Sequence, residues 1–213
     1  KISILCFAFV LIATFAKAQD KKIISPDGKL EVTVAINAGV PVYTVTYNGK
    51  IFLKPSPIGM KTNVGDFTKD LSISDKITQK SVDESYSLPN IKKSSVHYQA
   101  TETVLTFNKA EKPVFDVVFR VSNNDVAFRY KVYPQRDRLS CVVNEETSGF
   151  VFPEGTTTFL CPQSKPMVGF ARTMPSYETS YMPDAPMGKN GNDNNGFTFP
   201  CLFKVGTQGW VLI

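Results

Sequence analysis

Apolar and polar residues alternate with a period of two along most of this chain. From residue 30 to 36 every second position is Leu, Val or Ile, and the positions between are Glu, Thr and Ala. Residues 115–121 and 126–132 repeat the pattern, separated by the turn sequence Ser122-Asn123-Asn124-Asp125. Successive side chains of a strand point to opposite faces, so this period predicts strands with one apolar face. No window of useful length shows the 3.6-residue apolar stripe of a helix.

Turn sequences separate the predicted strands. Asn48-Gly49 lies between residues 42–47 and 50–53, and both central residues of a type I′ hairpin turn need positive φ, which favours Asn-Gly. Ser25-Pro26-Asp27-Gly28 places Pro and Gly where a β-turn favours them. Shorter strands are expected at residues 95–100, 103–107, 150–151, 157–160, 197–202 and from 210 onward. The sequence therefore predicts an all-β fold, an antiparallel β-sandwich of two or more sheets packed face to face.

The N-terminus has the composition of a secretory signal. Lys1 precedes an uncharged stretch from residue 2 to 15, and the triplet Ala16-Lys17-Ala18 follows. A basic start, a short apolar run and an A-x-A site define a signal peptide, whereas a membrane span needs about 20 apolar residues. A buried N-terminal helix is the alternative. We expect cleavage after Ala18, a periplasmic or secreted protein without a membrane anchor, and one β-sandwich domain from residue 19 to 213.

Both ends of the chain suggest a longer parent protein. The signal lacks an initiator Met, and the chain stops inside the predicted strand Trp210-Val211-Leu212-Ile213. Removal of Lys1 and Lys17 with the signal lowers the formal net charge from +5 to +3, and acids and bases are interspersed. Without a polybasic block, neither nucleic acid nor an anionic membrane is expected as a partner.

The cysteines do not form a recognisable metal motif. Cys141, Cys161 and Cys201 remain after signal removal, none is spaced as C-x-x-C, and the single histidine, His97, cannot complete a zinc site. One disulfide plus one thiol and three buried thiols both stay open.

The region from residue 162 to 196 differs from the rest of the chain. It carries five of the fourteen prolines and little alternation, which predicts long loops, and such loops are usually functional or disordered. Glu178 lies there between two tyrosines and near Arg172, which offers a hard oxygen for Ca²⁺ beside rings suited to sugar stacking. An ordinary solvated glutamate is the alternative. Residues 189–196 superficially resemble a calcium loop but lack its closing acid, so a mobile polar tip is expected.

Other candidates favour structural roles. His97 is expected to be a hydrogen-bonded or exposed strand histidine, and the adjacent Glu145 and Glu146 would face opposite sides of a strand, which suits no acid/base pair. Four aromatic residues are expected to be core or interface anchors: Phe197, Phe199, Phe203 and Trp210. No nucleophile elbow, zinc-protease, phosphate-loop or dinucleotide motif occurs. The residues alone predict an exported β-sandwich without a complete catalytic set.

A series of short segments carries a resemblance through its order and spacing. The segments are Ser25-Pro26-Asp27-Gly28-Lys29-Leu30, residues 43–47 before Asn48-Gly49, Ser56-Pro57-Ile58-Gly59, Phe119-Arg120, Val126-Ala127-Phe128-Arg129-Tyr130, Pro175-Ser176-Tyr177-Glu178, Phe199-Pro200-Cys201-Leu202-Phe203 and Trp210-Val211-Leu212-Ile213. Together they resemble the N-terminal domain of glycoside hydrolase family 97, exported bacterial α-glucosidases and α-galactosidases. The chain departs from the family at Asn124-Asp125, where a Gly is expected second, and over residues 81–93, which lack an expected Trp and Gly-Glu.

The resemblance implies a β-super-sandwich followed by a (β/α)₈ barrel and a small C-terminal β-domain. In the family the catalytic residues lie on the barrel, so none is expected in this chain. A calcium ion near the active site is held by barrel glutamates and one glutamate from the sandwich, and the Ser-Tyr-Glu setting assigns that donor to Glu178. The expected function is therefore the N-terminal, active-site-supporting domain of a calcium-dependent, exo-acting enzyme on α-linked oligosaccharides.

Two other functions remain open from the sequence. One is a free-standing carbohydrate-binding or adhesion sandwich without catalysis. The other is a self-contained all-β hydrolase whose carboxylates are not evident as a pair. The sugar and the stereochemical outcome depend on carboxylates outside these 213 residues.

Overall fold

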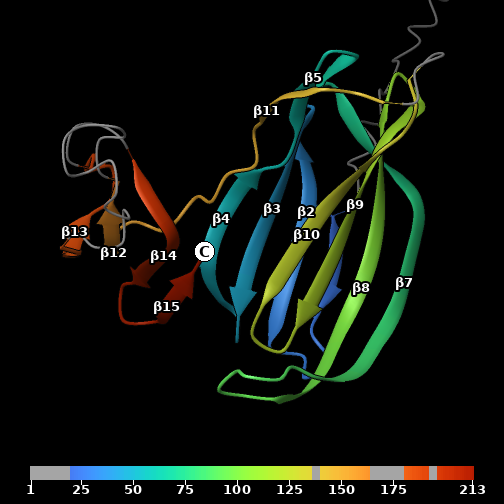
Figure 1. Ribbon diagram of the computed structural model, residues 1–213. Coiled ribbons are helices and arrows are strands. Elements are labelled where there is room, and N and C mark those ends of the chain that lie inside the picture. Colours follow the sequence, from blue (N-terminus) through green and yellow to red (C-terminus); the bar gives the residue numbers. More distant parts are fainter. Residues whose placement is uncertain (1–19, 136–139, 164–179, 192–195) are drawn as a thin grey trace, which may run out of the picture.

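The computed structural model describes residues 20–135, 140–163, 180–191 and 196–213. Within these ranges the regular structure consists of fifteen strands in four antiparallel sheets (Figure 1). The described residues contain no helix with the length and apolarity that a bilayer span requires. The predicted all-β, antiparallel fold is confirmed, while the expected signal peptide at residues 1–18 lies outside the described ranges.

The first sheet is a meander at the N-terminal end of the described chain. Its strands, in sheet order, are β1 (Lys21–Ile24), β2 (Leu30–Asn37), β3 (Val40–Tyr47) and β4 (Lys50–Pro57). Asn48 and Gly49 join β3 to β4 with φ values of 49° and 74°. These positive angles confirm the hairpin that the Asn-Gly pair predicts. Alternation along β2 is also confirmed, because Val32 and Val34 are fully buried and the residues between them are not.

The second sheet has longer strands and faces the first. Its order is β10 (Val126–Val132), β9 (Lys112–Ser122), β8 (Ser95–Lys109) and β7 (Leu71–Ser87). The hairpin of β9 and β10 is the one predicted. The strand character expected at residues 95–100 and 103–107 is confirmed, but the two segments form one strand, because β8 runs through both and pairs with β7 and β9 without a break there. The strand β7 was not predicted.

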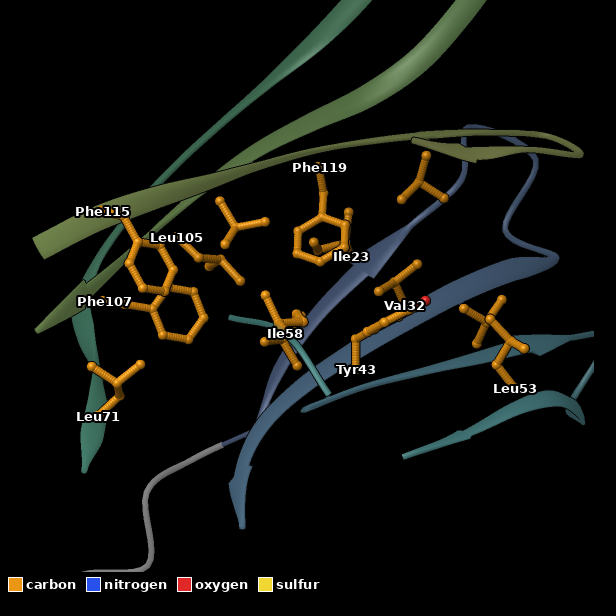
Figure 2. Packing of buried hydrophobic residues seen from close by; sticks show 14 of the residues in the cluster. Ile23, Val32, Tyr43, Leu53, Ile58, Leu71, Leu105, Phe107, Phe115 and Phe119 are labelled. Carbon is orange, nitrogen blue, oxygen red and sulfur yellow. The ribbon is translucent and has the colours of Figure 1, made fainter. Parts of the chain in front are cut away.

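A single apolar core fills the space between these two sheets. The ring of Tyr43 on β3 lies 6.3 Å from that of Phe119 on β9 and 5.6 Å from that of Phe128 on β10, measured between centroids. Phe107 and Phe115 stack at 5.0 Å within the second sheet. Figure 2 shows side chains from both layers pointing into this space. Burying such rings contributes roughly 25 cal/mol per Å² of apolar surface removed from water, so this core is the main stabilising feature of the sandwich.

A three-stranded sheet and a strap close one edge of the sandwich. The sheet order is β11 (Val143–Glu146), β5 (Met60–Thr62) and β6 (Gly65–Phe67). The strap, residues 147–151, then runs along β4: Thr147 N–H donates to the Gly59 carbonyl at 2.9 Å and Gly149 N–H to the Pro57 carbonyl at 3.0 Å. Lys54 N–H donates to the Val151 carbonyl at 2.7 Å. The expected strand at residues 150–151 was wrong, since Val151 forms only an isolated bridge to Lys54.

The fourth sheet lies beside the sandwich at the end of the strap (Figure 1). We call it the lateral sheet; its order is β13 (Met182–Pro186), β12 (Thr156–Pro162), β14 (Phe197–Val205) and β15 (Gly209–Leu212). Phe152 of the connection stacks on Phe203 of β14 at 4.2 Å, and Val205 is 1% exposed. Phe152 and Val205 belong to the main core cluster, and Phe203 packs against it. The lateral sheet is therefore joined to the sandwich through apolar contacts of one of its faces.

Strand β13 corrects the expectation of continuous loop between residues 162 and 196. Its residues pair with β12, Thr158 opposite Ala185 and Thr157 opposite Pro186. The segment was interpreted as loop because of its prolines. Proline is compatible with an edge strand, where the missing N–H faces away from the ladder, and β13 is at the edge of the lateral sheet.

Candidate functional site

The predicted calcium donor, Glu178, lies outside the described residues, so the structure does not test its assignment. In the sequence, its segment lies between β12, which ends at Pro162, and β13, which begins at Met182. Gln163 N–H donates to the Gly196 carbonyl at 3.0 Å, which closes the end of the lateral sheet. Next to it, a Cβ on Gly191 would lie 2.7 Å from the same carbonyl oxygen. The chain therefore needs glycine at this close approach. The predicted polar tip at 192–195 also lies outside the described residues.

The described residues do not bring together a metal-binding cluster. No group of three or more His, Cys, Asp or Glu side chains in the described ranges is arranged to hold an ion. Calcium takes 6–8 oxygen ligands, so one glutamate from this region would need most of its partners elsewhere. Calcium thus remains a proposal.

His97 has a local structural role on the β7–β8 ribbon. Its Nε2 lies 2.7 Å from Asp83 Oδ1, and Gln99 donates to the other oxygen of the same carboxylate at 2.9 Å. These hydrogen bonds, from Gln99 first and from His97 second, lower the pKa of Asp83. The group is exposed to solvent, which confirms the expectation of a hydrogen-bonded, exposed strand histidine.

The adjacent glutamates on β11 do not form an acid/base pair. All four residues of this strand are exposed, and Glu145 makes an ion pair with Lys61 at 2.7 Å. Neighbouring residues of a strand project to opposite faces, as expected for Glu145 and Glu146.

The thiols show no chemistry in the described part of the chain. Cys141 and Cys201 form no disulfide, and Cys161 and Cys201 are buried. Burial raises the pKa of the Cys201 thiol, which disfavours the nucleophilic thiolate. The sequence left a disulfide and buried thiols open as alternatives. The structure contains no disulfide between Cys141 and Cys201.

A shallow apolar groove lies where the strap meets the lateral sheet. Its volume is about 560 Å³, and it is lined by residues 150–157 together with Pro186 and Met187. Phe150 and Met187 are 41% and 44% exposed. Glu154 is the only acidic residue of this lining, so the groove holds no carboxylate pair of the kind that glycoside hydrolysis uses.

Exposed aromatic side chains gather on the lateral sheet. Phe159 and Tyr181 stack with centroids 4.9 Å apart and ring planes 13° apart, and both rings are partly open to solvent. Trp210 is 55% exposed and carries the Lys204 ammonium 5.7 Å from its ring centroid. Phe199 is 74% exposed. Aromatic faces of this kind suit protein interfaces and sugar stacking alike.

The aromatic residues expected as core or interface anchors differ in their burial. Phe203 packs against the core, whereas Phe199 and Trp210 do not. Phe159 was not predicted to be a surface aromatic, and Tyr181 was expected only as one of the two rings beside Glu178 that suit sugar stacking. Alternation along residues 157–160 and 202–205 contained the necessary signal, but the register between the strands was needed to bring those positions onto one face.

Comparison with known proteins identifies the family of this chain. The family model for the N-terminal region of glycosyl-hydrolase 97 proteins matches residues 23–213. The chain belongs to glycoside hydrolase family 97. A crystal structure of a β-arabinopyranosidase is 47% identical, with a TM-score of 0.84 over 91% of this chain and 31% of that chain. A family 97 enzyme from Pseudoalteromonas sp. strain K8 in complex with panose, 22% identical with a TM-score of 0.71 over 87% of this chain and 27% of that chain, shows the same fold.

Family 97 relatives with named activities are also similar in sequence. A probable retaining α-galactosidase of Streptomyces bingchenggensis is 33% identical over 135 residues, which are 63% of this chain and 20% of that protein. A retaining α-galactosidase of Bacteroides thetaiotaomicron is 27% identical over 157 residues, 74% of this chain and 22% of that protein. The matched regions thus span about a fifth of these two proteins.

Proposed function

We propose that this chain is the N-terminal domain of an exported, exo-acting glycoside hydrolase and supports an active site built by a following (β/α)₈ barrel. The family match over residues 23–213 carries this proposal. One observation agrees with it: the chain spans under a third of the solved structures it matches. Residues 1–18 would direct export and be removed, leaving one domain from residue 19 onward.

The substrate that we propose is an α-D-galactopyranoside or a β-L-arabinopyranoside. The structure at 47% identity is named a β-arabinopyranosidase, and both named sequence relatives are α-galactosidases. These sugars share the ring configuration from C1 to C4, and the arabinose lacks only the C6 hydroxymethyl group. The α-glucoside activity that the family resemblance also allows has less support, because the panose-bound structure is only 22% identical.

The substrate proposal is tested with the full polypeptide that contains this region. Hydrolysis rates would be compared on the 4-nitrophenyl glycosides of α-D-galactose, β-L-arabinopyranose and α-D-glucose. We expect kcat/KM on the first two to exceed that on the glucoside at least about tenfold, because a site built to bind an axial C4 hydroxyl is left with unpaired polar groups by the equatorial epimer. Preferred hydrolysis of the glucoside would contradict the sugar assignment. A complete lack of activity on all three glycosides would contradict the proposal that the protein is a glycoside hydrolase.

Calcium is the cofactor that we propose, with Glu178 as the ligand donated by this domain. A carboxylate oxygen is a hard ligand that Ca²⁺ accepts, and the remaining ligands would come from the barrel. When bound, the ion supplies a fixed positive charge near the acidic groups of the active site and so alters their pKa values. Glu178 would hold the domain and the barrel in one coordination shell.

The test of the calcium proposal is Glu178→Gln in the full polypeptide, since the amide keeps the size and removes the charge. We expect calcium affinity, measured by titration calorimetry, and kcat to fall together, and Glu146→Gln on the exposed strand β11 to change neither. If Glu178→Gln has the same calcium affinity and the same kcat as the unmodified protein, Glu178 is not a calcium ligand.

A second function is favoured by the exposed aromatics of the lateral sheet. Phe159, Tyr181 and Trp210 could stack on sugar rings in a carbohydrate-binding or adhesion module without catalysis. This alternative requires that the protein retain oligosaccharides of galactose or arabinose while hydrolysing none. Affinity electrophoresis in such polysaccharides, combined with the activity panel above, separates the two functions.

A further inference from the structure

The outer face of the lateral sheet is defined by the register of its strands. Phe159 on β12 pairs with Leu202 on β14, which pairs with Leu212 on β15. Residues directly opposite each other in an antiparallel sheet share a face, and so do residues two positions apart on one strand. The same face therefore also carries Lys204 and Trp210, which pair with each other.

The opposite face of the lateral sheet is the one that packs on the sandwich. Phe203 and Val211 are paired across β14 and β15, and both pack against the main core cluster. Thr158, opposite Phe203, is 6% exposed. One face of this sheet is therefore occupied, and the other stays open.

The open face has the composition of a buried surface. Leu212 is 65% exposed, Trp210 55%, Tyr181 43% and Phe159 38%. Two charged residues belong to this face: Lys204 lies over the Trp210 ring, where it covers part of the aromatic surface, and Asp184 of β13 accepts a hydrogen bond from the Thr157 hydroxyl at 3.3 Å. A β-sheet normally alternates buried apolar residues on one face with polar residues on the other, so a sheet that is apolar on both faces is built to be covered on both.

We propose that this outer face, defined by Phe159, Tyr181, Leu202, Trp210 and Leu212, is the docking surface for the part of the polypeptide that family 97 proteins carry beyond this N-terminal region. This inference rests on the proposed function, because it takes this chain to be one domain of a longer enzyme. Residues matched here make up 31% of the chain of the 47%-identical structure and about a fifth of the named relatives, so polypeptides of this kind carry a larger body of protein that can cover this face.

The composition of the face favours a protein occupant over a sugar. Aliphatic Leu202 and Leu212 share it with the aromatics, whereas sugar platforms present rings with polar groups that fix the hydroxyls. Aromatic and aliphatic residues with few charges are typical of the centre of a protein interface, and Trp is a frequent anchor there. The neighbouring groove, which shares Pro186 and Thr157 with the lateral sheet, extends the apolar area.

Hydroxyl-radical footprinting of the full polypeptide tests the proposal. Tyr86 on β7 is the internal reference, because it is 46% exposed and its strand belongs to the second sheet of the sandwich and not to the lateral sheet. We expect Trp210 and Tyr181 to be modified several-fold less than their exposed fractions predict, and Tyr86 to be modified as its exposure predicts. The protection of Trp210 should not change on dilution, because the occupant belongs to the same polypeptide.

A matched pair of substitutions adds a second readout. Leu212→Glu places a charge in the proposed interface, and Leu88→Glu places it at a position that is 43% exposed on the β7–β8 ribbon. We expect the first to lower the thermal midpoint of the full polypeptide and to increase Trp210 modification, and the second to do neither.

The outcomes separate this inference from the proposed function. Full modification of Trp210 in the full polypeptide, protection that is lost on dilution, or protection that appears only with added oligosaccharide would each overturn the docking surface. A protected Trp210 in a protein that hydrolyses no glycoside would overturn the proposed enzymatic function and would still support the docking surface.

Discussion

Glu102 on β8 is a buried carboxylate whose charge is balanced from two neighbouring strands. Arg120 Nε on β9 lies 2.6 Å from its Oε2, and Lys80 Nζ on β7 lies 3.0 Å from its Oε1. The hydrogen bond from Arg120, followed by that from Lys80, lowers the pKa of Glu102 below its ordinary value of 4.5. A lowered pKa in the folded state means that the stabilisation is complete above the unfolded value and is lost as the pH falls through the folded value.

Arg120→Ala is therefore expected to destabilise the protein by about 1–2 kcal/mol at neutral pH, because Glu102 keeps only Lys80 as a partner. Urea unfolding at pH 7 and at about pH 3 measures this, and the difference between variant and parent should shrink at the lower pH as Glu102 becomes protonated in both. Lys50→Ala, at an exposed position of β4, is the control. A difference that is independent of pH would show that Arg120 acts through packing alone.

Single residues also show what a sequence leaves open. A hydrogen bond from His97 could be predicted, since a strand histidine commonly finds a local partner. The partner itself could not be predicted, because Asp83 is fourteen residues away and is brought beside His97 by the register of β7 and β8. The role of Glu178 was assigned by resemblance, and its coordination depends on residues that other parts of an enzyme would supply.

Strands whose apolar residues alternate along the sequence were predictable, and strands held mainly by their backbone were not. The β9–β10 hairpin follows the alternation because Phe115, Val117 and Phe119 all point into the core. Most side chains of β7 are exposed instead, so its sequence of Ser, Asp, Lys and Thr contains no apolar period. Backbone pairing with β8 along almost its whole length forms this strand, and such pairing leaves little trace in a hydropathy pattern.

Gly59, between β4 and β5, is a position where the connection of two elements requires glycine. Its φ is +156°, and a Cβ would lie 2.7 Å from the Phe67 carbonyl oxygen and 3.1 Å from the Thr68 Cα. Its N–H donates to the Tyr130 hydroxyl at 3.0 Å, which ties this corner to β10. The backbone has no room to move away without breaking that bond.

Gly59→Ala is expected to destabilise the protein by more than about 2 kcal/mol, the range typical of a buried clash combined with an unfavourable φ. Gly155→Ala is the matched control: its φ is +75°, but nothing lies within 4 Å of the added Cβ. Gly155→Ala should lower the free energy of unfolding by about 1 kcal/mol, because only the left-handed backbone conformation is unfavourable there. Equal thermal midpoints for the two variants would show that the corner at Gly59 relaxes.

At the scale of the whole molecule, the sandwich and the lateral sheet meet through an apolar contact. Phe152 and Phe203 stack between them, Val205 belongs to the core cluster, and Val211 and Ile213 pack against it. The sequence predicted an all-β sandwich but not this division, because both parts show the same short-strand pattern. The division appears only in the pairing of the strands, which groups β12 to β15 apart from β1 to β11.

Phe152→Ala is expected to loosen the lateral sheet selectively, since truncation of a buried Phe leaves a cavity that costs about 3–5 kcal/mol when it does not collapse. Hydrogen exchange should accelerate in β12 and β14 and remain slow in β8 and β9, because the sandwich core keeps its own contacts. Tyr86→Ala, at a half-exposed position of β7, is the control. Uniform acceleration in all four strands would mean that sandwich and lateral sheet unfold as one cooperative unit.

The strap along β4 has a consequence for how this region tolerates sequence change. Its contacts to β4 are made by main-chain groups: the N–H groups of Thr147, Gly149 and Val151 all donate, the last to the Ser56 hydroxyl at 2.9 Å. Proline at any of these three positions would remove a donor, and an inserted or deleted residue would displace every later one. Among related proteins the strap should therefore keep a constant length. It should also keep Gly149, where an added Cβ would lie 3.0 Å from the Pro57 ring, and Ser148, whose hydroxyl lies 2.6 Å from the Tyr130 hydroxyl, while its other side chains vary.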